Sequence, residues 1–202
     1  MRNGNIIHHT AMVHDSAKIG TGNIIHAGVI ITANVEIGNN NEIFPYSVIG
    51  TTAEHRDSHN KASQMVIIGN DNIIREYVTI NAGTIRNTVI GSQCYFLRGS
   101  HIGHDCSIYD KVTLSCNALV GGESVIFEGA NLGLGVAIHQ RSIIGHYCMI
   151  GMNSTVTKKS KVVPFYKFVG SPLRGIGLNH IKYNSILPSD RIKLIQEYEG
   201  EI

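Results

Sequence analysis

The sequence predicts an all-β chain that winds as a parallel β-helix of hexapeptide repeats, and three observations predict this fold. A large apolar residue returns at every sixth position over long stretches of the 202 residues. Glycine often follows that residue, as in Ile19-Gly20 and Ile37-Gly38. Charged residues make up only 16% of the chain, where about 25% is usual for a soluble protein. We therefore expect a repeat whose inward side chains are aliphatic and whose corners are turned by small residues.

The six-residue period runs through residues 7–49, 68–80 and 90–168, and the last of these stretches holds fourteen consecutive repeats. A period of six fits neither the 3.6-residue period of a helix nor the simple alternation of an ordinary strand. It is typical of a β-helix in which each hexad supplies one short strand and one corner. Gly, Asn and Asp tolerate the positive φ of a tight corner. Three hexads make a coil of 18 residues, so we expect residues 18 apart to stack.

Two interruptions break the period and predict loops. Residues 51–66 are polar and out of phase, with the sequence TTAEHRDSHNKASQMV. We expect them to leave the coil, and long loops on rigid scaffolds often carry function. The second interruption, around Arg86, Asn87 and Thr88, resets the phase and indicates a corner insertion.

The last part of the chain changes character. We expect the β-helix to occupy residues 1–170, with its loop at 51–66, and residues 171–202 to form a short C-terminal helical segment. Gly170-Ser171-Pro172 punctuates the boundary. From Ser189, a candidate N-cap, apolar residues recur at the spacing of an amphipathic helix.

Charge and composition exclude several classes of protein. A formal charge of +2 argues against a strongly basic nucleic-acid binder. We expect no membrane span, because Gly, Asn or a charge interrupts every apolar run before the roughly 18 residues that a span needs. The first ten residues lack the apolar core of a signal peptide. The four cysteines lie singly in apolar surroundings and indicate a reducing, cytoplasmic location.

The densest cluster of polar candidates is the segment Gly99–Cys106, with the sequence GSHIGHDC. A histidine whose ring is oriented by a carboxylate can act as a general base near neutral pH, which makes His104 and Asp105 a candidate pair. Polar surface residues on one rung of the coil would give the same dipeptide. The eleven histidines also admit a zinc site that draws three ligands from neighbouring chains. The positions of the histidines within the hexads differ, which disfavours that arrangement.

Three segments carry a resemblance to a known family: residues 68–84 (IGNDNIIREYVTINAGT), 101–106 (HIGHDC) and 137–152 (AIHQRSIIGHYCMIGM). They resemble the hexapeptide-repeat acyltransferase family, and within it the UDP-N-acetylglucosamine O-acyltransferases of lipid A biosynthesis. The resemblance covers about residues 7–180 and is most specific at 101–106 and 137–151. It implies a left-handed coil and a cytoplasmic homotrimer with its sites in clefts between adjacent coils.

The resemblance also implies a reaction. A (3-hydroxy)acyl group would pass from acyl carrier protein to the 3-hydroxyl of UDP-N-acetylglucosamine, with no cofactor beyond the phosphopantetheine that the acyl donor carries. His104 corresponds to the general base, Asp105 to its orienting partner, and Gly122 to the glycine whose N–H binds the oxyanion. Each also has a plain structural interpretation, which for Gly122 is a corner glycine.

The resemblance implies a further set of substrate-binding residues. His101, His139 and Gln140 correspond to substrate contacts on the coil face near the base, and Met152 to the residue that limits the acyl chain length. Glu54 and Arg56 in the loop offer the acidic and basic groups that grip the sugar. The full set is His101, His139, Gln140, Glu54, Arg56, Asn81, Glu123 and Met152.

Some positions depart from the family pattern and leave alternatives open. Asn81 and Glu123 stand where the family has histidine, and the C-terminal helical segment is shorter than the family's. A related O- or N-acyltransferase, acting on another nucleotide-linked sugar with acyl-CoA or acyl carrier protein as donor, is therefore the first alternative. A trimeric zinc enzyme similar to carbonic anhydrase is the lesser one. Basic residues in the C-terminal third would form either a solvated surface or a docking patch for an anionic carrier.

Overall fold

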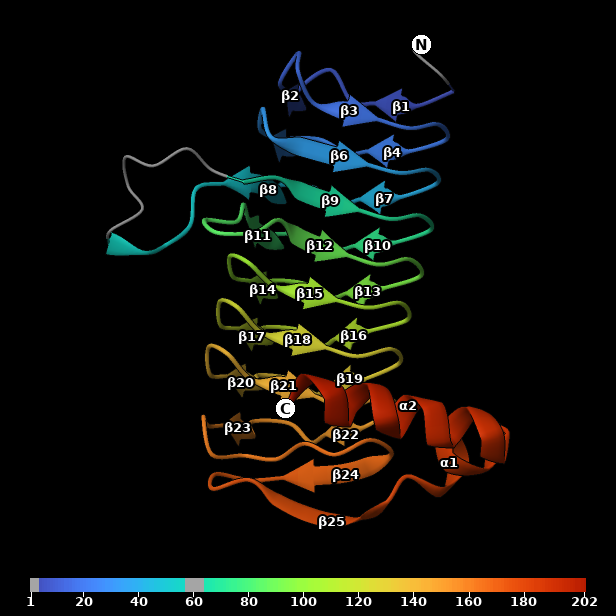
Figure 1. Cartoon of the computed structure of the whole chain (residues 1–202). Helices are drawn as coiled ribbons and strands as arrows, with labels where there is room; N and C mark the ends of the chain where they lie inside the picture. The colour runs from blue at the N-terminus through green and yellow to red at the C-terminus, as the bar shows by residue number, and fades with distance from the viewer. Residues whose placement is uncertain (1–3, 57–63) are drawn as a thin grey trace.

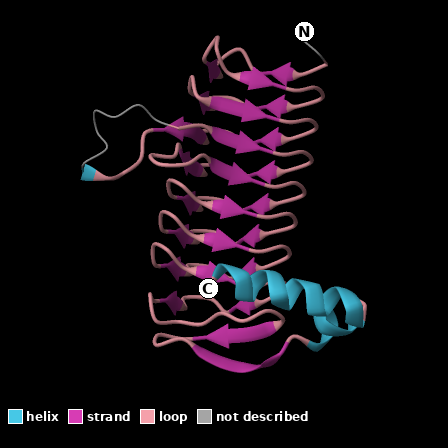
Figure 2. Ribbon diagram, in the orientation of Figure 1, coloured by secondary structure: helices cyan, strands magenta, loops and turns pink. Residues whose placement is uncertain are grey.

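The computed structural model describes residues 4–56 and 64–202, and it confirms the parallel coil (Figure 1). Two-residue strands alternate with tight corners along most of the chain, and each strand pairs with the strand one coil later (Figure 2). In the regular part the register is 18 residues, so that Ile102 pairs with Val120 and Val120 with Ile138. The two loops lengthen individual coils without losing this stacking, because Ile80 still pairs with both Ile49 and Ile102.

Three sheets form the faces of the coil. The first sheet contains β1 (Ile6–Ile7), β4 (Ile24–Ile25), β7 (Glu42–Ile43), β10 (Ile73–Ile74), β13 (Tyr95–Phe96), β16 (Thr113–Leu114), β19 (Asn131–Leu132), β22 (Met149–Ile150), β24 (Tyr166–Val169) and β25 (Arg174–Leu178). The second contains β2 (Met12–Val13), β5 (Ile30–Ile31), β8 (Val48–Thr51), β11 (Thr79–Asn81), β14 (His101–Ile102), β17 (Leu119–Val120), β20 (Ala137–Ile138) and β23 (Thr155–Val156). The third contains β3 (Lys18–Ile19), β6 (Val35–Ile37), β9 (Val66–Ile68), β12 (Thr88–Ile90), β15 (Ser107–Ile108), β18 (Val125–Ile126) and β21 (Ile143–Ile144).

The second residue of each short strand explains the aliphatic period. Ile43, Ile74, Ile102 and Ile126 are fully buried and belong to one continuous core that runs along the inside of the coil. The first residue of the strand points outward, as the alternation of side chains in a strand requires. The outward positions are therefore free to carry the chemistry of each rung.

The corners of the coil account for the many asparagines, and they also hold large residues in left-handed backbone. Asn23, Asn41 and Asn72 are buried, and the Oδ1 atom of each accepts the backbone N–H of the residue one coil later at 2.8–3.0 Å. Corners with positive φ hold not only glycine but also larger residues, among them Glu123 and Arg141, both with φ of 61°. The structure thus holds left-handed backbone at corners where the sequence shows no small residue.

The C-terminal part contains a strand as well as helices. β25 pairs antiparallel with β24 and closes the first sheet, so the segment after residue 170 begins as a β-hairpin. α1 (His180–Ser185) and α2 (Pro188–Glu201) follow, and α2 lies across the side of the coil (Figure 1). α2 begins at Pro188 rather than after an N-cap at Ser189, because proline suits the first helical position. The buried ring of Tyr198 docks the helix against Phe127.

The chain leaves the coil after Thr51, as the sequence predicts, and residues 52–56 extend away from it (Figure 1). β8 ends at Thr51 and β9 begins at Val66, and the part of the loop at residues 57–63 lies outside the described residues. Neither α1 nor α2, nor any other helix in residues 4–56 and 64–202, has the length and hydrophobicity that a membrane span requires.

Candidate active site

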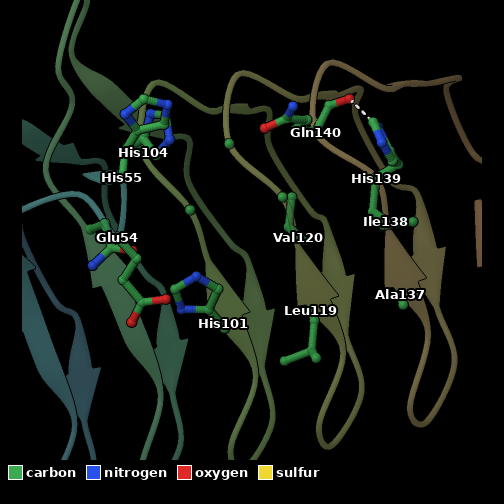
Figure 3. A pocket seen from close by; sticks show the side chains of 14 residues that line it. Glu54, His55, His101, His104, Leu119, Val120, Ala137, Ile138, His139 and Gln140 are labelled. Atoms are coloured by element: carbon green, nitrogen blue, oxygen red, sulfur yellow. Dashed lines mark hydrogen bonds between the residues drawn. The ribbon is translucent and has the colours of Figure 1, made fainter. Parts of the chain in front are cut away.

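A cavity of about 410 Å³ lies where strands of the second sheet run into their corners, beside the base of the 51–66 loop (Figure 3). Residues at the ends of β11, β14, β17 and β20 form its wall, because successive coils bring the same corner position into one column. The cavity is lined by Glu54, His55, Asn81, His101, Gly103, His104, Leu119, Val120, Gly121, Gly122, Ala137, Ile138, His139 and Gln140. Most of the predicted site residues are therefore brought together in one place.

The His104 ring is held at this cavity by Asp105. Its Nδ1 lies 2.6 Å from the Asp105 Oδ2, and the side chain of His104 is only 13% exposed. Because a carboxylate accepts but does not donate, the Nδ1 carries a proton, and in the neutral ring the Nε2 keeps its lone pair. The ring of His55, from the loop, packs edge-on against that of His104, with 6.0 Å between the ring centroids (Figure 3). The imidazole is thus oriented with a basic nitrogen available to a ligand.

Asp105 is kept ionised although it is buried. Burial alone would raise the pKa of its carboxyl, but hydrogen bonds from His104, from the Arg86 N–H, from the Thr84 hydroxyl and from the Ile85 N–H hold that pKa well below its usual range. Its backbone has a positive φ of 60°, and its own N–H donates to the Thr88 Oγ1 at 2.9 Å. The carboxylate beside His104 is therefore a fixed negative charge.

Gly122 lies against the Nε2 edge of the His104 ring. A methyl group added at Gly122 would sit 2.6 Å from the His104 Nε2, closer than real side chains pack. In the described part of the chain, no coil hydrogen bond uses the Gly122 N–H, whereas its carbonyl accepts the Arg141 N–H at 2.9 Å. Because Gly122 has no side chain, its backbone can lie close to the His104 Nε2, and its N–H is free to donate to a ligand.

His101 forms the second polar group of the cavity. Its Nδ1 lies 2.8 Å from the Thr79 Oγ1, and the Glu54 carboxylate points toward its ring (Figure 3). Burial lowers the pKa of His101, an effect that Glu54 opposes and the neighbouring His104 reinforces. His101 is accordingly neutral at pH 7 and can exchange hydrogen bonds without carrying charge.

An apolar strip continues from His101 along the second sheet. His101 pairs with Leu119, and Leu119 pairs with Ala137, so their outward side chains lie in one row (Figure 3). Leu119 lines the cavity and is 49% exposed. Two coils after the corner of His104, the His139 Nδ1 lies 2.7 Å from the backbone carbonyl oxygen of Gln140.

Two of the three predicted residues in and beside the loop line the cavity, and the third does not. Glu54 and Asn81 line the cavity, while Arg56 is exposed and does not. Asn81 is buried and donates its amide to the Thr51 hydroxyl at 3.1 Å and to the Thr52 carbonyl at 3.2 Å. Its Oδ1 has no hydrogen-bond partner among the described residues.

Glu123 and Met152 lie outside the cavity. Glu123 follows Gly122 and forms a two-pronged ion pair with Arg141, with distances of 3.0 and 2.8 Å. Met152 is 67% exposed at a different corner of the coil, after a strand of the first sheet. Their expected roles toward a substrate stay predictions.

Sequence reasoning singled out neither His55 nor Thr84 as a site residue. His55 belongs to the predicted loop, but nothing in the sequence specifies which loop residue turns back to the coil. Thr84 precedes the phase reset, which was the visible signal that the corner is unusual. Among residues 4–56 and 64–202, no group of three or more His, Cys, Asp or Glu side chains is arranged to hold a metal ion.

Comparison with known proteins places this site in a family, although no family model matches the chain. It is 36% identical over 141 residues to the acyl-(acyl-carrier-protein)–UDP-N-acetylglucosamine O-acyltransferase of Sinorhizobium fredii, which covers 68% of this chain. It is 33% identical over 157 residues to the enzyme of the same name from Helicobacter pylori, which covers 76% of this chain. The chain belongs to the hexapeptide-repeat acyltransferase family.

Solved structures of hexapeptide-repeat acyltransferases agree with this fold. The UDP-N-acetylglucosamine acyltransferase of Francisella novicida matches with a TM-score of 0.81 at 29% identity, over 96% of this chain and 79% of that one. The enzyme of Moraxella catarrhalis matches with a TM-score of 0.79 at 29% identity, over 96% of this chain and 81% of that one. The predicted left-handed parallel β-helix with a short helical tail is confirmed. In sequence, the chain spans 51% and 57% of the length of the Sinorhizobium and Helicobacter relatives.

Proposed function

We propose that this chain transfers an acyl group from a phosphopantetheine thioester to a hydroxyl of UDP-N-acetylglucosamine, as a step of lipid A synthesis. The observation that carries the proposal is the His104–Asp105 pair, which turns a basic nitrogen toward Gly122 in a cavity with an apolar strip beside it. The similarity to enzymes named for this reaction supports the choice of substrates.

The chemistry follows from the arrangement of these groups. The His104 Nε2 takes the proton of the sugar hydroxyl as that oxygen attacks the thioester carbonyl, forming the new C–O bond. The Gly122 N–H donates to the oxyanion that develops on the carbonyl oxygen. When the tetrahedral intermediate collapses, the C–S bond breaks and the leaving thiolate takes the proton back from His104. Asp105 remains ionised throughout and stabilises the transient imidazolium.

Substrate binding divides between polar and apolar walls. Leu119 and Ala137 offer an apolar row to the acyl chain, next to the polar groups of His101 and Glu54. Neutral His101 and the Glu54 carboxylate suit the hydroxyls of a sugar. Asn81, where the family has histidine, favours a second candidate, a transferase that acylates a different nucleotide-linked sugar.

We propose that the acyl donor lies along the column of corner residues that begins at His104 and ends at a basic cavity. His104, Gly122, Gln140 and Lys158 are each 18 residues apart and in register, so Lys158 lies three rungs beyond the base, about 14 Å away at the usual strand spacing. A second cavity of about 460 Å³ there is lined by Arg141 and three lysines, Lys158, Lys159 and Lys161. This distance and charge suit the phosphate of a phosphopantetheine arm, carried either by acyl carrier protein or by coenzyme A.

We also propose that the chain works as a homotrimer, in the cytoplasm. Leu119, Leu134, Met149 and Met152 are large apolar side chains that the single coil leaves 41–67% exposed. Closed symmetric assembly is the common way to cover such a surface. Sedimentation equilibrium tests this directly, since a monomer at micromolar concentration would contradict it.

The deciding experiment is a transfer assay with a panel of acyl-carrier-protein and coenzyme A thioesters against several nucleotide sugars. We expect turnover with UDP-N-acetylglucosamine, and a loss of 100-fold or more in His104→Gln, because general-base catalysis contributes about 10²–10⁴ in rate. The matched control is His180→Gln, which changes an exposed histidine at the start of α1. Turnover of another sugar alone would transfer the proposal to the second candidate. Stoichiometric zinc with hydration of carbon dioxide would overturn it.

A further inference from the structure

The break in the six-residue period after Ile80 corresponds to a short loop that contacts the proposed catalytic pair. Ile80 and Ile90 are ten residues apart instead of six, and the extra residues form a short loop between β11 and β12. The loop closes tightly at Gly83, where an added methyl group would lie 1.6 Å from the Arg86 carbonyl oxygen. A side chain at Gly83 is therefore incompatible with this loop, and the tight closure turns the next N–H groups inward.

Those N–H groups converge on the carboxylate of Asp105. The backbone N–H groups of Thr84, Ile85 and Arg86 all donate to the Asp105 Oδ1, at 2.9, 2.9 and 2.8 Å. The Arg86 Nε also donates to the Asp105 carbonyl at 2.8 Å, which fixes the backbone of the same residue. Three successive N–H groups on one oxygen form an anion-binding concavity, here occupied by a side chain of the chain itself.

The other carboxylate oxygen is shared between the base and one side chain of the loop. The Asp105 Oδ2 accepts the His104 Nδ1–H at 2.6 Å and the Thr84 hydroxyl at 2.7 Å. The Thr84 hydroxyl is thus the loop's side-chain donor to the oxygen that orients the imidazole. Any change in that hydroxyl alters the acceptor that His104 uses.

We propose that Thr84 is a positioning residue, which sets the orientation and the basicity of His104 through the shared Asp105 oxygen. The inference rests on the proposed function, because it assigns Thr84 to the same base. The hydroxyl draws charge from the Asp105 Oδ2 and so limits how strongly the carboxylate stabilises a protonated ring. Together with the three N–H donors on the Oδ1, it fixes the carboxylate beside the His104 Nδ1.

The direction of the effect can be derived from these contacts. Without the Thr84 hydroxyl, the Asp105 carboxylate holds a protonated His104 more strongly, so His104 stays protonated to a higher pH. The acidic limb of kcat/KM then moves upward, by about half a pH unit for one neutral donor lost from a carboxylate. The other titratable groups that face His104 are His55, His101 and Glu123, and all of them are unchanged in the variants.

The variants are Thr84→Val, which keeps the shape and removes the hydroxyl, and Thr84→Ser, which restores it. Thr113→Val serves as the matched control, because Thr113 is also half-buried but lies on β16 in the first sheet, not at the corner that holds Asp105. We expect Thr84→Val to lower kcat/KM about tenfold and to move its acidic limb upward, while Thr84→Ser and Thr113→Val behave as wild type. Thermal unfolding of each variant identifies any loss of folded protein.

A second measurement works without turnover. Imidazole ¹⁵N NMR of the substrate-free chain, with the His104 signal assigned by its loss in His104→Gln, reports which ring nitrogen carries the proton. We expect a single Nδ1–H form of the neutral ring in wild type and in Thr84→Ser, and in Thr84→Val a doubly protonated ring that persists to higher pH. If wild type shows this form but transfers no acyl group, the proposed function fails and the positioning role stands. An unchanged ¹⁵N pattern in Thr84→Val overturns the inference, as does a folded Thr84→Val that loses activity with an unmoved limb.

Discussion

The substitution Gly122→Ala should leave the fold intact but displace the imidazole of His104. The added methyl group would lie 2.6 Å from the His104 Nε2 and within 2.9 Å of two ring carbons. An ordinary contact begins at 3.4 Å, so the ring and the new methyl must separate by 0.8 Å. Gly122 has no positive φ, and alanine is therefore allowed by the backbone. The displacement falls on the catalytic ring.

The expected result follows from that displacement. A misplacement of about 1 Å can cost 100-fold in rate, so we expect Gly122→Ala to lower kcat about 100-fold while the chain unfolds at nearly the wild-type temperature. Combining Gly122→Ala with His104→Gln should add little to the effect of His104→Gln, because both changes disable one unit.

The assay is initial-rate acyl transfer beside thermal unfolding, with Gly175→Ala as the matched control. A methyl group at Gly175 would meet only the Phe168 ring, at 3.6 Å, an ordinary contact. Activity of Gly122→Ala within twofold of wild type would refute the placement of His104 against Gly122. A fully additive double variant would show that the two residues act separately.

Three further predictions concern stability and donor binding. Burial lowers the pKa of His146 to about 4, below the roughly 6.5 of an unfolded histidine. Unfolding in this pH range therefore takes up a proton. The free energy of unfolding should fall by about 2–3 kcal/mol as the pH drops from 6.5 to 4. His146→Phe should flatten that fall in urea titrations, and an equally steep fall in the variant would contradict this. Asn41→Ala removes the acceptor of the Asn72 N–H within the buried ladder and should cost about 2–4 kcal/mol in urea unfolding, whereas a change below 0.5 kcal/mol would show that the ladder contributes little. Replacing Lys158, Lys159 and Lys161 together with Gln should raise KM for the acyl donor about tenfold at low salt with kcat nearly unchanged, and a KM that stays constant would remove the basic cavity from donor binding.

The coil could be predicted from the sequence because its core obeys a local rule. Each hexad places one aliphatic residue inward, so positions such as Ile102 and Ile126 are specified by spacing alone. β25 could not be predicted in this way. Its sequence, RGIGL, carries no period, and its antiparallel pairing with β24 depends on a reversal of the chain after residue 170.

The site was predictable to the extent that it follows the stacking of coils. His104, Gly122 and Gln140 are 18 residues apart, and the regular register brings them into one column. Thr84 could not be placed from spacing, because it lies 21 residues from Asp105 across the irregular coil. The return of His55 to His104 likewise depends on the path of a loop that leaves the coil.

The central claim is that His104, held by Asp105, is the base in acyl transfer. The most direct measurement is the single-turnover rate of acyl transfer to UDP-N-acetylglucosamine by wild type and by His104→Gln, at saturating acyl donor. We expect the variant to be slower by 100-fold or more while it binds both substrates as wild type does. A His104→Gln variant that transfers the acyl group within a few fold of the wild-type rate would contradict the claim.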